Sequence, residues 1–208
     1  MPDDEACEYF LDTSVYVGYA TEWDQYYEHC KRMCDGSYPK NSSVTVKNEI
    51  DGLIRDYKRY QQELDRNAGD IETMIRAELN PNRRRFLEQV KEHSSKGIRN
   101  NYERLSKIRL SVGILIDGIL EVFGKTKKPL IPASSNYTLI ESLTFIGDRN
   151  DAQILADAAD WSKNMICETV FCTKDMQHIV KNAATIREIL IRDSDGACHL
   201  QIRHINAF

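Results

Sequence analysis

Apolar and polar positions along the chain follow two periods, one typical of short buried strands and one typical of amphipathic helices. Apolar or alternating runs predict strands at residues 9–11, 42–44, 129–132, 169–172 and 199–205, the last at a sheet edge. Three- and four-residue steps predict helices at residues 22–33, 45–54, 81–96, 102–123, 136–146, 151–161 and 176–192. Strands that alternate with helices favour an α/β fold, a three-layer α/β/α sandwich with a central, mainly parallel sheet.

Local signals define several helix ends. Thr45 is a candidate N-cap, and Asn80-Pro81 is a cap followed by a favoured first helical position. Gly97 and Gly124 are candidate stops for the two helices before them. The apolar stripe of the helix at 102–123, from Tyr102 to Phe123, is interpreted as core or as a helix–helix contact.

Composition fits a folded domain without a membrane span. The chain has 208 residues, 41% of them hydrophobic and 29% charged. Its longest apolar stretch, residues 114–123, is interrupted by Asp117 and Glu121, and the chain opens with acids at residues 3–5 rather than with a basic leader. Six cysteines without a C-x-x-C pair indicate free thiols. These features together predict a cytoplasmic protein.

Charge is distributed unevenly. Residues 53–128 hold 17 Lys/Arg and 11 Asp/Glu, whereas the rest of the chain holds 11 and 21. A basic middle within an acidic protein indicates a partner, although solvated faces of long helices explain the pattern equally well. Candidate phosphate contacts in this region are Arg83, Arg84, Arg85, Lys96, Arg99, Lys125, Lys127 and Lys128.

Four acidic residues carry the candidate chemistry. Asp12 and Asp175 follow predicted strands, and Glu49 and Asp151 lie near the starts of predicted helices. Carboxyl ends of parallel strands and the helix starts after them share one edge of a sheet, so the four carboxylates are expected in one cleft. Clustered carboxylates repel, which raises at least one pKa, with Asp12 the candidate. Oxygen-ligated Mg²⁺ or Mn²⁺ would offset this charge.

Each acid also has a structural interpretation. An Asp at a helix start is commonly a cap, which applies to Asp151 and Asp175, and Glu49 taken alone is a surface residue. Asp148 lies three residues before Asp151 and could replace it as a ligand. Asp157 is a lesser candidate.

The motifs around these acids are Y-F-L-D-T-S-V at 9–15, N-E-I at 48–50, D-A-Q-I-L-A at 151–156 and T-K-D at 173–175. In order and residue type the chain resembles the PIN-domain nuclease superfamily (VapC-like). The resemblance covers residues 8–55 and 130–208. It implies a single PIN-like domain over 1–208 in which residues 56–128 supply extra charged and amphipathic helices, partly an insertion.

The resemblance implies a metal-dependent endoribonuclease. Asp12, Glu49, Asp151 and Asp175 would hold Mg²⁺ or Mn²⁺, and the hydroxyls of Ser14 and Thr173 would orient the carboxylates. Single-stranded or looped RNA is the expected substrate, and an antitoxin-like protein and a second copy of the chain are further candidate partners. Toxin and RNA-processing roles both stay open.

Two other classes of function compete with the nuclease. One is a non-catalytic interaction module that keeps the PIN fold and binds a protein or RNA partner through the helical insertion. The other is an unrelated α/β protein in which the four acids are helix caps.

Overall fold

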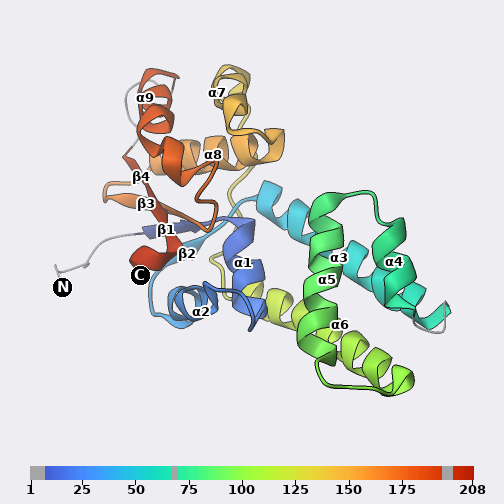
Figure 1. Cartoon of the computed structure of the whole chain (residues 1–208). Coiled ribbons are helices and arrows are strands. Elements are labelled where there is room, and N and C mark those ends of the chain that lie inside the picture. The colour runs from blue at the N-terminus through green and yellow to red at the C-terminus, as the bar shows by residue number, and fades with distance from the viewer. Residues whose placement is uncertain (1–7, 67–69, 194–198) are drawn as a thin grey trace. The chain divides into compact units, whose positions relative to one another are not determined.

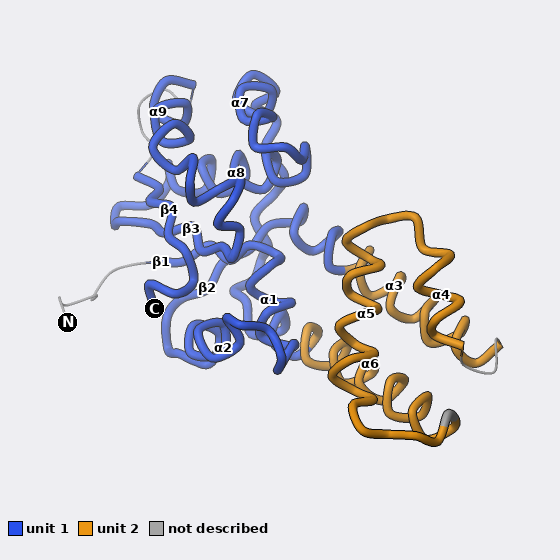
Figure 2. Tube along the Cα trace, viewed as in Figure 1, with its two compact units in different colours: residues 1–50, 121–208 blue, residues 51–120 orange. Residues whose placement is uncertain are grey.

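A computed structural model describes residues 8–66, 70–193 and 199–208. The acidic start at residues 3–5 lies outside the described residues, as do Cys7 and Cys198. By its internal contacts the chain divides into two compact units, residues 1–50 with 121–208 and residues 51–120 (Figure 2).

The first unit is built on a parallel sheet of four strands in the order β2-β1-β3-β4. Phe10 pairs in register with Phe171, and Tyr9 with both Val170 and Lys40. The predicted α/β class and parallel sheet are thereby confirmed. The strands are β1 (Glu8–Leu11), β2 (Lys40–Asn41), β3 (Thr169–Thr173) and β4 (Leu200–His204).

Helices cover the sheet on both sides (Figure 1). Phe10 stacks on Phe171 and contacts Trp161 of α8 on one face, with ring centroids 5.7 and 5.9 Å apart. Successive strand residues face opposite sides, and Tyr9 accordingly packs against Tyr38. The arrangement is compatible with a three-layer sandwich. The helices of this unit are α1 (Thr13–Ala20), α2 (Tyr27–Asp35), α7 (Tyr137–Leu143), α8 (Arg149–Ser162) and α9 (Ala183–Asp193), with 3₁₀ turns η1 (Thr144–Ile146), η2 (Val180–Asn182) and η3 (Ile205–Ala207).

The second unit is helical. Two long helices, α3 (Val44–Arg66) and α6 (Asn101–Gly124), have residues in both units, and α4 (Ile71–Ala77) and α5 (Pro81–Ser95) lie wholly in the second. The rings of Tyr57 and Phe86 stack with centroids 4.5 Å apart. The second unit has its own hydrophobic core. Its buried side chains include Tyr60, Leu87, Val90, Ile108 and Val112.

Helix ends in this second unit follow the predicted signals. The Asn80 side chain accepts hydrogen bonds from the backbone N–H groups of Asn82 and Arg83, at 3.0 and 3.2 Å, and so caps α5. Gly97, with φ of +80°, follows the end of this helix. On α6 the predicted apolar stripe is buried at Ile108 and Ile119, whereas Tyr102 and Leu120 are exposed.

Several predicted elements are wrong. Residues 13–20 form α1, which the sequence analysis missed, because their mixture of Val and Tyr has no helical period. The predicted strand at 129–132 is reduced to one isolated bridge between Ile131 and Ser43, since Pro129 and Pro132 cannot donate to a ladder. The weak strand expected at 42–44 lies instead at 40–41.

The helix expected at 45–54 is longer and runs from Val44 to Arg66 as α3. Thr45 is therefore not its N-cap; Ser43 stands there, and its Oγ accepts from the N–H of Val46 at 3.3 Å.

Three further helices also differ from the predicted bounds. The helix expected at 22–33 begins at Tyr27, and the helix expected at 176–192 is divided into a turn, η2 and α9. Helix α8 begins at Arg149. Within the described ranges, every helix is too short or too polar to span a membrane.

Candidate functional site

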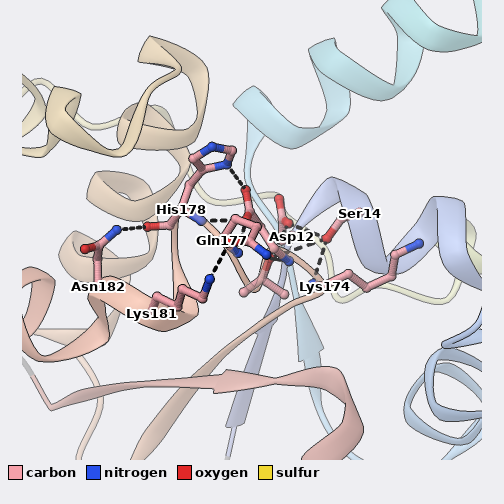
Figure 3. Close-up of polar contacts among 9 residues, drawn as sticks. Asp12, Ser14, Lys174, Gln177, His178, Lys181 and Asn182 are labelled. Atoms are coloured by element: carbon pink, nitrogen blue, oxygen red, sulfur yellow. Dashed lines mark hydrogen bonds and ion pairs between the residues drawn. The ribbon is translucent and has the colours of Figure 1, made fainter. Parts of the chain in front are cut away.

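Asp12 lies at the carboxyl end of the central strand β1. Its backbone N–H donates to the carbonyl of Cys172 at 3.1 Å, which continues the ladder to β3 by one residue. The side chain is 5% exposed although it makes no capping bond to α1. Its Oδ2 instead accepts from Ser14 Oγ at 2.5 Å and from Thr173 Oγ1 at 2.8 Å (Figure 3). Asp12 is therefore a buried acid whose geometry is fixed by two hydroxyls.

The two hydroxyls are themselves oriented by the backbone after β3. Ser14 Oγ accepts from the N–H of Lys174 at 3.0 Å, and Thr173 Oγ1 accepts from the N–H of Asp175 at 3.0 Å. Each hydroxyl has one proton, which it donates to Asp12. Ser14 and Thr173 thus hold the Asp12 carboxylate in one orientation and join the ends of β1 and β3.

Glu49 reaches the same edge of the sheet from α3. Its Oε2 accepts from Thr13 Oγ1 at 2.5 Å, next to Asp12 in the chain. Burial raises the pKa of Glu49, the Thr13 bond opposes this shift, and the charges of Asp12 and Asp148 add to it. Glu49 is therefore a half-buried carboxylate within the field of two others, not an isolated surface residue.

Asp151 stands in the first turn of α8. The N-cap of this helix is Asp148, whose Oδ1 accepts from the N–H of Asn150 at 2.7 Å, so the interpretation of Asp151 as the cap is wrong. Burial is the largest cause that raises the pKa of Asp151 to about 7, followed by the charges of Asp12, Asp148, Glu49 and Asp175. All five causes raise the pKa of Asp151. Asp151 therefore lies among the other acids with little compensating charge.

Asp175 follows β3 and closes a turn. Its Oδ1 accepts from the N–H groups of Gln177 and His178, at 2.9 and 2.8 Å, and its Oδ2 lies 3.0 Å from His178 Nδ1 (Figure 3). Asp175 is therefore a cap, as one interpretation of the sequence expected, but it caps a turn and not a helix. Its charge also raises the pKa of Asp151. His178 was not among the predicted site residues; its three-residue spacing from Asp175 is the signal that was available.

Asp157 serves a different part of the fold. It is fully buried, and its Oδ1 accepts from the N–H of Ser134 at 2.7 Å and from Gln153 Nε2 at 2.9 Å. These bonds fix the loop before α7. Asp157 is not among the charges that raise the pKa of Asp151, which leaves it outside the cluster.

The carboxylates gather without a preassembled coordination shell. In the described part of the chain, no group of three or more His, Cys, Asp or Glu side chains is arranged to hold a metal ion. Burial is the largest cause of the raised pKa values of Asp12, Glu49 and Asp151. Repulsion between carboxylates adds to the shift at Glu49 and Asp151, whereas the expected effect of repulsion on Asp12 is not found, because burial alone raises its pKa.

Acidic partners occupy several of the candidate phosphate contacts. Arg83 pairs with Asp56 at 2.7 Å, and Lys125 pairs with Asp35 at 2.9 Å. Lys127 pairs with Glu8 at 2.9 Å. These pairs reduce the free positive charge that the sequence count suggested.

Comparisons with protein-family models, with curated proteins and with solved structures find no match to this chain. The resemblance to PIN-domain nucleases therefore rests on the motifs around Asp12, Glu49, Asp151 and Asp175.

Proposed function

We propose that this chain is a metal-dependent ribonuclease with a PIN-like fold that hydrolyses RNA phosphodiester bonds at the carboxyl edge of its sheet. Asp12, Glu49, Asp151 and Asp175 form the site, and Ser14 and Thr173 orient Asp12. The carrying observation is the shared neighbourhood of these acids, in which four other carboxylates act on Asp151. Gathering buried negative charge costs free energy, and a protein that binds no cation has little reason to retain such a cluster.

The donor set fits Mg²⁺ or Mn²⁺. Both are hard cations that prefer carboxylate oxygens, and thiolate or imidazole ligands are not needed. When bound, such a cation lowers the pKa of a water and stabilises the charge of the leaving oxygen. Small rotations of side chains such as Asp151 and Glu49 would bring their oxygens together once their repulsion is offset.

The chain's own residues have distinct roles in this proposal. Asp12 is held by Ser14 and Thr173, which fix the orientation of its carboxylate. The Asp151 carboxyl carries a proton for part of the time at neutral pH, since its pKa is about 7, and it releases that proton when a cation binds. Asp175 is kept in place by its own turn. Hydrolysis then adds water across one P–O bond and leaves a phosphate and a hydroxyl.

The preferred substrate is single-stranded or looped RNA, on the strength of the resemblance alone. A phosphodiester backbone that is not held in a duplex can bend to reach carboxylates at the ends of buried strands. A duplex would have to be opened first. Toxin and RNA-processing roles use the same chemistry and differ only in target.

A second candidate function is a non-catalytic interaction module that uses the helical unit at 51–120. The observation that favours it is the lack of a preassembled metal group among the described residues. The two candidates differ in cation binding, which the nuclease needs and the module does not.

The test is cleavage of labelled single-stranded and hairpin RNA with Mn²⁺ and with EDTA. We expect Mn²⁺-dependent cleavage that Asp12→Asn abolishes. The matched control is Asp70→Asn, because Asp70 caps α4 from an exposed position and Asn caps equally well. Unchanged cleavage by Asp12→Asn would refute the assignment. Absence of both cleavage and Mn²⁺ binding in the native chain would favour the interaction module.

A further inference from the structure

Helix α6 carries an exposed stripe formed by Lys107, Leu110, Ile114 and Asp117, which we call the α6 stripe. Leu110 and Ile114 are 57% and 56% exposed, although both are large and apolar. Steps of three and four residues place all four side chains on one face of the helix. This face is distinct from the buried one formed by Ile108, Val112 and Leu115.

A groove runs beside the α6 stripe within the second unit. Gln61 of α3 donates through Nε2 to the carbonyl of Arg109 at 3.1 Å, and Asp65 of α3 pairs with Arg109 at 2.9 Å. These bonds hold the two helices together along a groove of about 720 Å³ whose lining includes Leu110, Gly113 and Ile114. Gly113 has no side chain, so the groove reaches close to the α6 backbone.

Two opposite charges, Lys107 and Asp117, flank the apolar pair. Lys107 and Asp117 are both exposed, and neither has an ion-pair partner among the described residues. Three other charges of the same helix are paired: Arg104 with Glu72, Arg109 with Asp65, and Glu121 with Lys125. The α6 stripe is therefore an apolar centre with one unpaired positive end and one unpaired negative end.

The spacing of the α6 stripe is symmetric. Leu110 and Ile114 lie two residues on either side of position 112, and Lys107 and Asp117 lie five residues on either side. When two copies of α6 lie antiparallel about a two-fold axis at this position, Leu110 meets Ile114 of the second copy. Lys107 then meets Asp117 of the second copy, and the reverse pair forms at the other end. Apolar centres with charged flanks are the usual basis of helix pairing.

We propose that a second copy of this chain binds the α6 stripe, in an antiparallel homodimer formed by α6 of each copy. The charge pattern favours this occupant, because the face is complementary to itself. One helix pair buries less than the roughly 1,200 Å² at which stable interfaces begin, so the dimer forms reversibly as concentration rises. The inference is independent of the ribonuclease proposal.

The experiment uses the full chain and two charge reversals, Lys107→Asp and Asp117→Lys, with mass measured by sedimentation over a range of concentrations. We expect the native chain to shift from monomer to dimer. Each single variant should stay monomeric, because two like-charged contacts replace two ion pairs. An equal mixture of the two variants should form a heterodimer, since every flanking contact then joins Lys to Asp.

Arg85→Glu is the matched control, a charge reversal at an exposed position of α5 outside the α6 stripe, and it should dimerise like the native chain. Circular dichroism confirms that each variant is folded. A native chain that stays monomeric at its highest soluble concentration overturns the proposal. A dimer that both reversals leave unchanged, or a mixture that fails to associate, also overturns it; in the monomeric case a helix of another protein becomes the candidate occupant.

Discussion

Two opposing effects act on the pKa of Asp12. Burial raises its pKa, whereas hydrogen bonds from Ser14, Thr173 and the backbone N–H groups of residues 13 and 14 lower it, and the net direction is upward. The charged form is thus less favourable in the fold than in water. A residue of this kind costs stability at neutral pH unless a cation offsets it.

We therefore predict that Asp12→Asn leaves the cation-free protein at least as stable as the native chain at pH 7. Asn keeps the size of the side chain and its acceptor oxygen but removes the buried charge. The measurement is urea unfolding in EDTA. A loss of more than about 1 kcal/mol, the usual cost of one hydrogen bond, would instead indicate that the Asp12 carboxylate is structural.

Asp151 gives the cluster a pH dependence. Its pKa is about 7 in the fold against an ordinary value of 3.8, so between these values the unfolded chain has lost a proton that the folded chain keeps. The free energy of unfolding should therefore fall as pH rises from about 4 to about 7 in the cation-free protein. Unfolding at several pH values should show a flatter curve for Asp151→Asn. Identical curves would place Asp151 in solvent, away from the other acids.

Ser14 is the residue that tests the orientation of Asp12. Ser14→Ala removes one donor to Asp12 and leaves Thr173 as the other. We predict about a 10- to 100-fold loss of Mn²⁺ affinity, the usual effect of removing a group that orients a ligand. Titration calorimetry measures it, with Ser135→Ala as an exposed control. Equal affinities for the two variants would show that Thr173 alone suffices.

At the scale of elements, short-range signals predicted β1, β3, β4 and the Asn80 cap, because each depends on residues adjacent in the chain. The same signals missed α1, whose helical state depends on burial of Val15 and Tyr16. The bond from Thr13 to Glu49 exists only because α1 turns Thr13 toward α3. The contact between Thr13 and Glu49 therefore could not be predicted from the local sequence pattern.

Helix α8 shows how one element separates two adjacent acids. Asp148 caps the helix, while Asp151, one turn inside, faces the cluster. We predict that Asp148→Ala costs about 1 kcal/mol of unfolding free energy, the usual value of a cap, and that Asp148→Asn costs little. Urea unfolding measures both changes. Loss of Mn²⁺-dependent cleavage in Asp148→Asn, with stability retained, would make Asp148 a ligand.

For the whole molecule, composition and charge predicted a folded chain with a separate basic region. The structure assigns most of that region to the unit at 51–120. The sequence count could not show that Arg83 and Lys125 are paired with acids distant in the chain. The motifs along the chain gave the order of the four site acids. They could not show that the N–H groups of Gln177 and His178 orient the Asp175 carboxylate, because these bonds depend on the geometry of the backbone turn.

The division into units yields a prediction about where a cation acts. Mn²⁺ should slow amide hydrogen exchange in β1, β3 and the start of α8, which carry the acids, and leave α4 and α5 unchanged. Mass spectrometry of exchanged peptides measures this. Asp12→Asn should remove the protection. Uniform protection of both units would mean that cation binding stabilises the chain as one cooperative body.

The ladder between β1 and β3 joins residues 8–11 to residues 169–172. A ribosome makes Asp12 early and Thr173 late, and most of the chain must leave the exit tunnel before these two side chains can meet. The complete cluster therefore forms only after β3 has been synthesised. If the chain cleaves RNA, the nascent protein is harmless to the message and the ribosome that produce it, and activity begins only after the last strands have joined the sheet.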